Sequence, residues 1–207
     1  MKMGSRARPA IPPIPTGTYI AVCIGVVELG RQESVYNGKT RYTDKVRIIF
    51  EIPSQRIEVD GEEVPRWISR DFALTSAPNG NLRGFVQTWL GKTFSDMDAG
   101  EFELFDLLGQ QAMLSTVVSE DGKYANINSA IPLPDGMIAP PATSQFIKFD
   151  VEEWDDDAFA ALPEYLQKKI MNSMEYRDKH LPEDTVSVEA AEAAASAAAE
   201  SEGRAPF

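Results

Sequence analysis

Residues 18–29 read TYIAVCIGVVEL, a segment rich in β-branched residues and apolar on both of its faces. This pattern predicts a strand that is buried in the middle of a sheet. Gly25 lies near the centre of the segment. A glycine inside a strand suggests a bulge or a sharp bend, which small barrels use to turn corners.

Two further strands follow this segment. Residues 41–52 alternate, with one face formed by Val46, Ile48, Phe50 and Ile52, and the other by Lys45, Arg47, Ile49 and Glu51. Such alternation is typical of a strand with one buried face, so we expect the second face to point outward. Residues 55–59 and 64–74 flank an Asp60-Gly61 pair, which predicts a hairpin leading into a third strand.

The period then changes from two to that of a helix. Residues 76–90 place apolar side chains at helical spacing, namely Leu82, Phe85, Val86 and Trp89. Ser76 and Gly91 fit the N-cap and C-cap positions. A second short helix is predicted over residues 103–108, and a last hairpin joins residues 111–119 to 123–131.

The order of elements is therefore three strands, a helix and two strands, as in the OB-fold barrel. We expect a mainly β protein, a five-stranded OB-fold barrel with the helix between strands 3 and 4. An open five-stranded sheet is the alternative.

Composition divides the chain into four parts. Residues 1–15 form a flexible, basic, proline-rich arm, and residues 16–136 form the OB-fold domain. Residues 137–181 provide a linker and a short helical appendage, and residues 182–207 a disordered acidic tail. Residues 150–207 hold 5 basic and 15 acidic side chains, against 15 and 17 in residues 1–149. The net charge of −12 therefore belongs mainly to the C-terminal part.

Several classes of chemistry are disfavoured by what the sequence lacks. One cysteine, Cys23, and one histidine, His180, leave no internal disulfide and few nucleophilic or metal sites. Two Gly-Lys-Thr triplets, at residues 38–40 and 91–93, lack the earlier glycine of a phosphate-binding loop. We therefore expect no enzyme activity, no metal and no cofactor. No apolar run approaches the length of a membrane span, and no secretory signal is evident, so we expect a cytoplasmic protein.

Basic and aromatic residues gather instead on the predicted strands and loops. Cations that follow the phosphates and aromatic faces that stack on bases are what holds a single nucleic-acid strand. The predicted binding residues are Arg31, Tyr36, Lys39, Arg41, Tyr42, Lys45, Arg47, Arg66, Trp67, Arg70, Phe72, Lys123 and Tyr124. Phe72 and Trp67 have opposite parity on the third strand, so one of the two is expected in the core.

Over residues 16–176 the chain resembles the small single-stranded-DNA-binding proteins of tailed bacteriophages. The motifs that carry the resemblance are Gly17-x-Tyr19, residues 45–53, Asn81-Leu82-Arg83, Trp89-x-Gly91-Lys92-x-Phe94, residues 105–109, residues 124–127, Leu133-Pro134-x-Gly136 and residues 162–173. The resemblance implies an OB-like barrel that coats single-stranded DNA during phage replication or recombination in the host cytoplasm. It also implies self-association, as a homodimer.

The C-terminal residues are similar to the tip of bacterial single-strand-binding proteins, which docks replication and repair enzymes. Here an acidic tail ends in Pro206 and Phe207, which predicts a docking peptide for replication or recombination proteins. The sequence thus favours a non-catalytic single-stranded-DNA-binding protein. The alternative is a phage protein-interaction or inhibitory module on a similar barrel that binds no nucleic acid.

Overall fold

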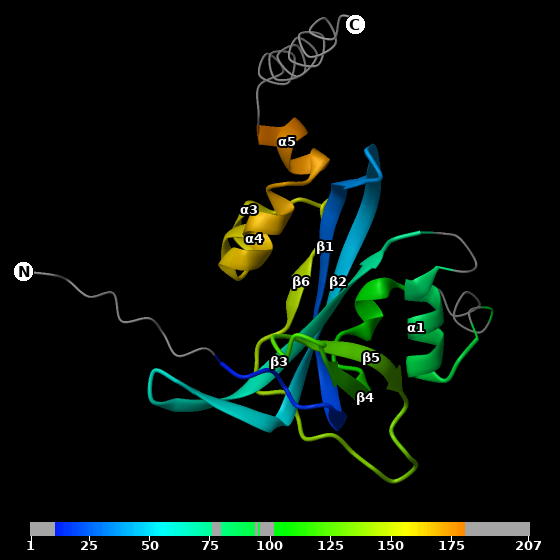
Figure 1. Ribbon diagram of the computed structural model, residues 1–207, viewed down its shortest axis with the longest axis vertical. Coiled ribbons are helices and arrows are strands. Elements are labelled where there is room, and N and C mark those ends of the chain that lie inside the picture. The colour runs from blue at the N-terminus through cyan, green and yellow to red at the C-terminus, as the bar shows by residue number, and fades with distance from the viewer. Residues whose placement is uncertain (1–10, 76–79, 94, 96–101, 181–207) are drawn as a thin grey trace, which may run out of the picture. The chain divides into compact units, whose positions relative to one another are not determined.

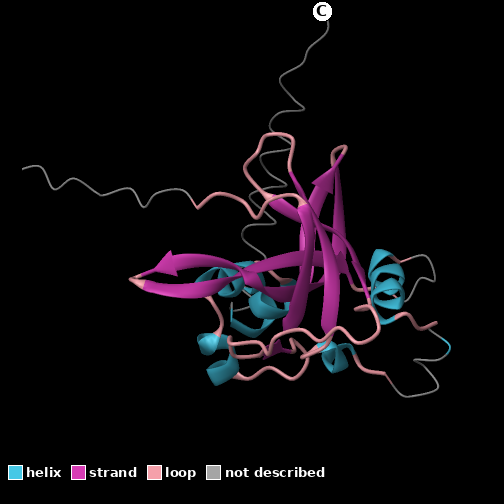
Figure 2. Ribbon diagram, turned by 90° about the horizontal axis from the view of Figure 1, so that it is seen from below, coloured by secondary structure: helices cyan, strands magenta, loops and turns pink. Residues whose placement is uncertain are grey.

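The computed structural model describes residues 11–75, 80–93, 95 and 102–180. Its strands are β1 (Gly17–Tyr36), β2 (Lys39–Val59), β3 (Glu62–Ala73), β4 (Gln111–Val118), β5 (Ala125–Ile131) and β6 (Ile147–Phe149) (Figures 1 and 2). Its helices are α1 (Asn81–Leu90), the 3₁₀ helix η1 (Leu104–Leu107), α3 (Asp156–Ala161), α4 (Glu164–Ile170) and α5 (Met174–His180). The predicted Ser76 cap, most of the N-terminal arm and the acidic tail with Pro206 and Phe207 lie outside the described residues.

The strands form one mainly antiparallel sheet in the order β3-β2-β1-β4-β5, and β6 pairs with β1 in parallel. Antiparallel ladders join β2 to β3, β1 to β4 and β4 to β5. The sheet is open, with β3 and β5 at its two ends. The predicted closed barrel is therefore not confirmed. The part of the protein that the structure describes is mainly β, with six strands and a few short helices.

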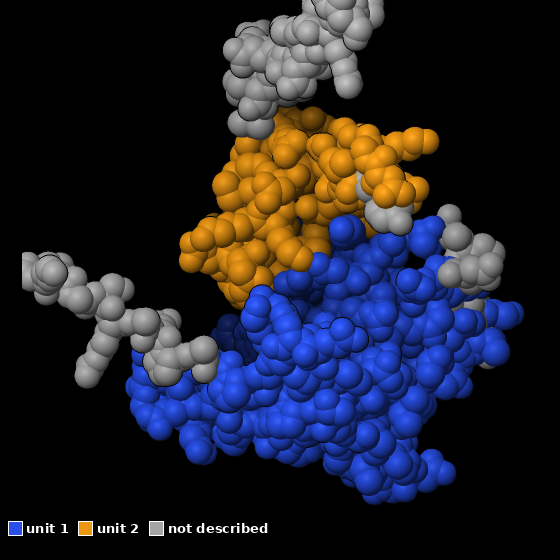
Figure 3. All heavy atoms as spheres, viewed as in Figure 1, with its two compact units in different colours: residues 1–28, 45–150 blue, residues 29–44, 151–207 orange. Residues whose placement is uncertain are grey.

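The chain divides into two compact units (Figure 3). The first unit comprises residues 1–28 and 45–150, and the second comprises residues 29–44 and 151–207. Sequence analysis had placed residues 29–44 with the rest of residues 16–136. No helix among the described residues is long and apolar enough to span a membrane.

The core of the first unit lies between the sheet and α1. β1 is buried as predicted, from Ala21 through Val27, and burial raises the pKa of the Cys23 thiol to about 12. Phe50 of β2 packs edge-on against Trp89 of α1, with ring centroids 4.9 Å apart. Aromatic pairs in this geometry add about 0.5–1.5 kcal/mol to the gain from burial.

The apolar periodicity predicted the buried face of α1 correctly. Leu82, Phe85, Val86 and Trp89 are all buried, and Gly91 ends the helix in the left-handed conformation at φ 63°. The indole N–H of Trp89 donates to the carbonyl of Gln111, 2.8 Å away. The helix begins at Asn81, later than predicted, and its N-cap Gly80 provides no side-chain cap.

The prediction that one face of β2 points outward is mostly wrong. Ile49 and Glu51 are fully buried, and Lys45 and Arg47 are half-buried. The reason is a covering segment that follows β5. Thr143 and Ser144 in this segment hydrogen-bond to the Glu51 carboxylate, and β6 then pairs with β1.

Side-chain atoms of Ile49, from this same face of β2, lie close to Gly25. A Cβ atom added there would lie 2.9 Å from Cδ1 and 3.0 Å from Cβ of Ile49. A Cβ atom added at Gly84 in α1 would meet nothing within 4 Å.

Gly25→Ala should therefore lower the free energy of unfolding by about 1–3 kcal/mol, because the core must shift to make room. Gly84→Ala is the matched control and should raise it by up to about 1 kcal/mol, since alanine favours a helix interior. Urea denaturation measures both. Equal stability of the two variants would contradict the close packing of β1 on β2.

Candidate nucleic-acid interface

The predicted binding residues are distributed over both units. The second unit holds Arg31, Tyr36, Lys39, Arg41 and Tyr42. The first unit holds Lys45, Arg47, Arg66, Trp67, Arg70, Phe72, Lys123 and Tyr124. The thirteen residues therefore form two sets, and each set is described by itself.

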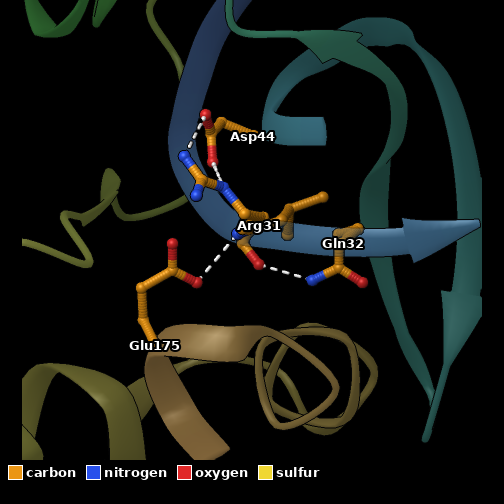
Figure 4. A network of polar contacts seen from close by, with 5 residues as sticks. Arg31, Gln32, Asp44 and Glu175 are labelled. Carbon is orange, nitrogen blue, oxygen red and sulfur yellow. Dashed lines mark hydrogen bonds and ion pairs between the residues drawn. The ribbon is translucent and has the colours of Figure 1, made fainter. Parts of the chain in front are cut away.

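In the second unit, Arg31 is occupied by contacts within the protein (Figure 4). Its Nε and Nη2 donate to the Asp44 carboxylate at 2.9 and 3.3 Å, and its backbone N–H donates to Glu175 at 2.8 Å. The hydrogen bond to Asp44 and the charge of that carboxylate raise the pKa of Arg31. Arg31 thus helps to join β1 to the start of α5, and its charge is neutralised locally.

The other members of this set lie at the ends of β1 and β2. Lys39, Arg41 and Tyr42 are exposed on β2. Tyr36 is the last residue of β1, and its side chain lies outside the described part of the structure.

Two cations of the first unit also have carboxylate partners. Arg47 of β2 donates a short hydrogen bond to Asp71, its register partner on β3. Lys123, in the turn between β4 and β5, lies 3.6 Å from the Asp121 carboxylate. Tyr124 beside it is exposed.

Phe72 is a core residue, which corrects its prediction as a binding residue. Only 3% of it is exposed, and its ring centroid lies 4.8 Å from that of Phe85. Trp67 has the opposite parity on β3 and is 40% exposed. Of these two aromatic residues, Trp67 is therefore the exposed one.

Arg66 and Arg70 of β3 differ from the paired cations. Arg66 Nη2 donates to the carbonyl of Pro12 at 2.6 Å, and Arg70 Nη1 donates to the carbonyl of Ile127 at 3.2 Å. Burial lowers the pKa of Arg66. Among the described residues, neither guanidinium contacts a carboxylate. β3 therefore carries two half-buried cations whose charge no described neighbour neutralises.

A cavity of about 530 Å³ opens beside Trp67. Ile57, Val64 and Pro65 form an aliphatic wall, and Arg66, Thr143 and Ser144 contribute polar groups. The cavity thus combines an aromatic face, a cation and hydroxyl groups.

Trp67 is held in place from the core. Its indole N–H donates to Oγ of Ser144 at 2.9 Å, and the backbone N–H of Ser144 donates to the Glu51 carboxylate, also at 2.9 Å. The other carboxylate oxygen of Glu51 accepts from the backbone N–H of Thr143. Burial alone would raise the pKa of Glu51, but the hydrogen bonds from Ser144 and Thr143 outweigh it and hold that pKa below its usual value. Sequence analysis missed this network, because no local pattern joins residues about ninety positions apart.

Two more cavities lie where β3 and β5 approach each other. One of about 370 Å³ is lined by Arg47, Ser69, Arg70, Asp71, Asn126 and Ile127. The other, of about 350 Å³, lies between α1 and β5 and includes Arg70, Asn81, Thr88, Asn128 and Ser129. Arg70 lines both. Among the described residues, no group of three or more His, Cys, Asp or Glu side chains is placed to hold a metal ion.

Glu51→Gln should lower the free energy of unfolding near neutral pH by about 1–3 kcal/mol, because an amide cannot accept from both backbone N–H groups. A carboxylate with a lowered folded pKa stabilises the protein above its unfolded pKa of about 4.3, and this contribution disappears as the pH falls through the folded value. The deficit of the variant should therefore shrink in acid.

Urea denaturation at neutral and acid pH measures this effect. Glu58→Gln, at an exposed position of the same strand, is the control and should behave as the wild type. A deficit that does not change with pH would show that the Glu51 charge does not stabilise the covering segment.

Comparisons with protein-family models, with curated proteins and with solved structures find no match to this chain. A function for this chain must therefore be inferred from the arrangement of its own residues, above all Arg66, Trp67 and Arg70 on β3.

Proposed function

We propose that the protein binds single-stranded DNA without catalysing a reaction, and that β3 is its main binding element. The observation that carries the proposal is that Trp67, Arg66 and Arg70 line cavities along this one strand, while neither arginine contacts a described carboxylate. Single strands are held by the same combination of stacking faces and unneutralised cations.

Trp67 is suited to stack on a base. It is 40% exposed and lines a cavity with an aliphatic wall, and the Ser144 hydroxyl fixes the edge of the indole. A ring that is already fixed loses little conformational entropy when a base stacks on it. Arg66, beside it in the same cavity, is available to the phosphate of the stacked nucleotide.

The strand order and the sequence motifs support the same function. The order β3-β2-β1-β4-β5 is that of OB folds, which use their second and third strands to bind oligonucleotides. The resemblance to tailed-phage single-stranded-DNA-binding proteins extends the proposal. In this extended proposal, a homodimer coats DNA during replication or recombination in the host cytoplasm, and the tail ending in Pro206 and Phe207 docks partner enzymes.

One observation favours a second candidate, a protein-interaction or inhibitory module. Arg31, Arg47 and Lys123 are each paired with an aspartate. A cation that is already paired contributes less to DNA binding, because it displaces fewer counterions from the phosphates.

Fluorescence anisotropy with a labelled oligo-dT of about thirty nucleotides separates the two candidates. The DNA-binding proposal predicts binding that weakens with salt and is stronger for the single strand than for a duplex of equal length. No binding by a folded sample would contradict it and would leave the protein-interaction module.

Trp67→Ala should weaken oligo-dT binding roughly 5- to 150-fold, the loss expected from about 1–3 kcal/mol for one stacked base. Trp67→Phe should recover part of the affinity, since it keeps a stacking ring. Tyr165→Ala removes an exposed aromatic side chain of α4 and serves as the control, with unchanged affinity. If Trp67→Ala binds as the wild type does, bases do not stack on Trp67.

A further inference from the structure

We propose that the bound strand runs along the cavities where β3 and β5 approach each other, and that Arg70 binds one of its phosphodiester groups there. This inference rests on the proposed function and specifies where the strand runs. It moves the main phosphate contact away from Lys45 and Arg47 on β2, where the alternation of the sequence had placed it.

The first argument is the charge of Arg70. Its guanidinium lies over the rings of Phe72 and Phe85, 4.9 and 5.7 Å from their centroids, and it donates to one backbone carbonyl. A guanidinium has five N–H donors and stays charged at any working pH. The aromatic faces hold its position, and donors remain for an anion. A phosphate accepts two of them in parallel and neutralises the charge.

The second argument is the contrast with Arg47. Both arginines line the same 370 Å³ cavity, but Arg47 is paired with Asp71 across the β2–β3 ladder. Asp71 lines this cavity too, but its charge is offset by Arg47, whereas Arg70 contacts no carboxylate among the described residues. Arg70 is therefore the better phosphate ligand in this cavity.

The third argument is the space on both sides of Arg70. It forms a shared wall of the 370 Å³ cavity and of the 350 Å³ cavity between α1 and β5. Asn126 lines the first cavity, and Asn81 and Asn128 line the second. Carboxamides both donate and accept, which matches the edges of nucleobases. Two cavities joined at one cation suit a linear polyanion better than a compact ligand.

The cavity beside Trp67 and the cavities beside Arg70 lie along the same strand, β3. Residues 64–67 of β3 line the Trp67 cavity, and residues 69–71 line the next one. Arg66 and Arg70 are four residues apart, which is about 13 Å along a strand, so they engage different phosphates. Trp67 and Arg70 have opposite parity on β3, so one strand of DNA meets both where it crosses the open edge of β3.

The test compares Arg70→Gln with Arg56→Gln in the full chain, by oligo-dT anisotropy over a range of salt concentrations. Arg56 is an exposed β2 residue paired with Glu63. It lines neither of the cavities beside Arg70, so its variant removes one positive charge at another place. Arg70→Gln should weaken binding roughly tenfold or more at low salt and reduce the slope of log affinity against log salt by roughly 0.7. Arg56→Gln should change affinity by less than about twofold.

A second variant covers the case in which Arg70→Gln disturbs the core around Phe72. Gly84→Leu places a side chain in the α1–β5 cavity, where a Cβ atom meets nothing within 4 Å, and leucine favours a helix. It should keep or raise the melting temperature and still weaken oligo-dT binding. If the wild type binds oligo-dT, and if Gly84→Leu and folded Arg70→Gln both bind it with the same affinity, the path is overturned and the proposed function stands. No binding by the wild type would overturn both.

Discussion

Among the described strands, β3 has a ladder partner on one edge only, and this open edge is the constraint from which the candidate interface follows. Ile68 and Phe72 bury one face of β3 in the core, so the strand is held firmly. Cavities lie beside Arg66, Trp67 and Arg70, at the edge where no described strand pairs with β3. Open edges invite pairing with other chains, and proline and charged residues oppose it. β3 carries both kinds of residue, which keeps its edge available to a ligand.

The interface is connected to the core by a carboxylate. Glu51 belongs to the most buried part of β2, yet its oxygens fix the backbone of Thr143 and Ser144, and Ser144 fixes Trp67. Burying a carboxylate is costly unless several donors satisfy it. Here the donors belong to a segment without regular structure, which the carboxylate orders. A binding surface whose side chains are ordered in advance loses less entropy when it binds.

Local periodicity was enough to predict β1, the buried face of α1 with its Gly91 cap, and the order of the elements. It was not enough where distant segments meet. Ile49 and Glu51 alternate as an outward face does, and only the covering segment buries them. The parity of Trp67 and Phe72 showed that one belongs to the core, but not which one. Arg47 and Arg70 look equivalent in the sequence, and Asp71 distinguishes them only once β2 and β3 pair. The edge of β3 is open because β3 and β5, which are about sixty residues apart, do not pair.

The most direct test of the account is hydrogen–deuterium exchange of the full chain with and without saturating oligo-dT. Backbone amides that a ligand covers or stabilises exchange more slowly. The account predicts slower exchange in residues 64–71 of β3 and 126–130 of β5, together with residues 143–144 behind Trp67. Slower exchange confined to residues 31–45, with β3 and β5 unchanged, would contradict it and place the bound strand on the exposed ends of β1 and β2.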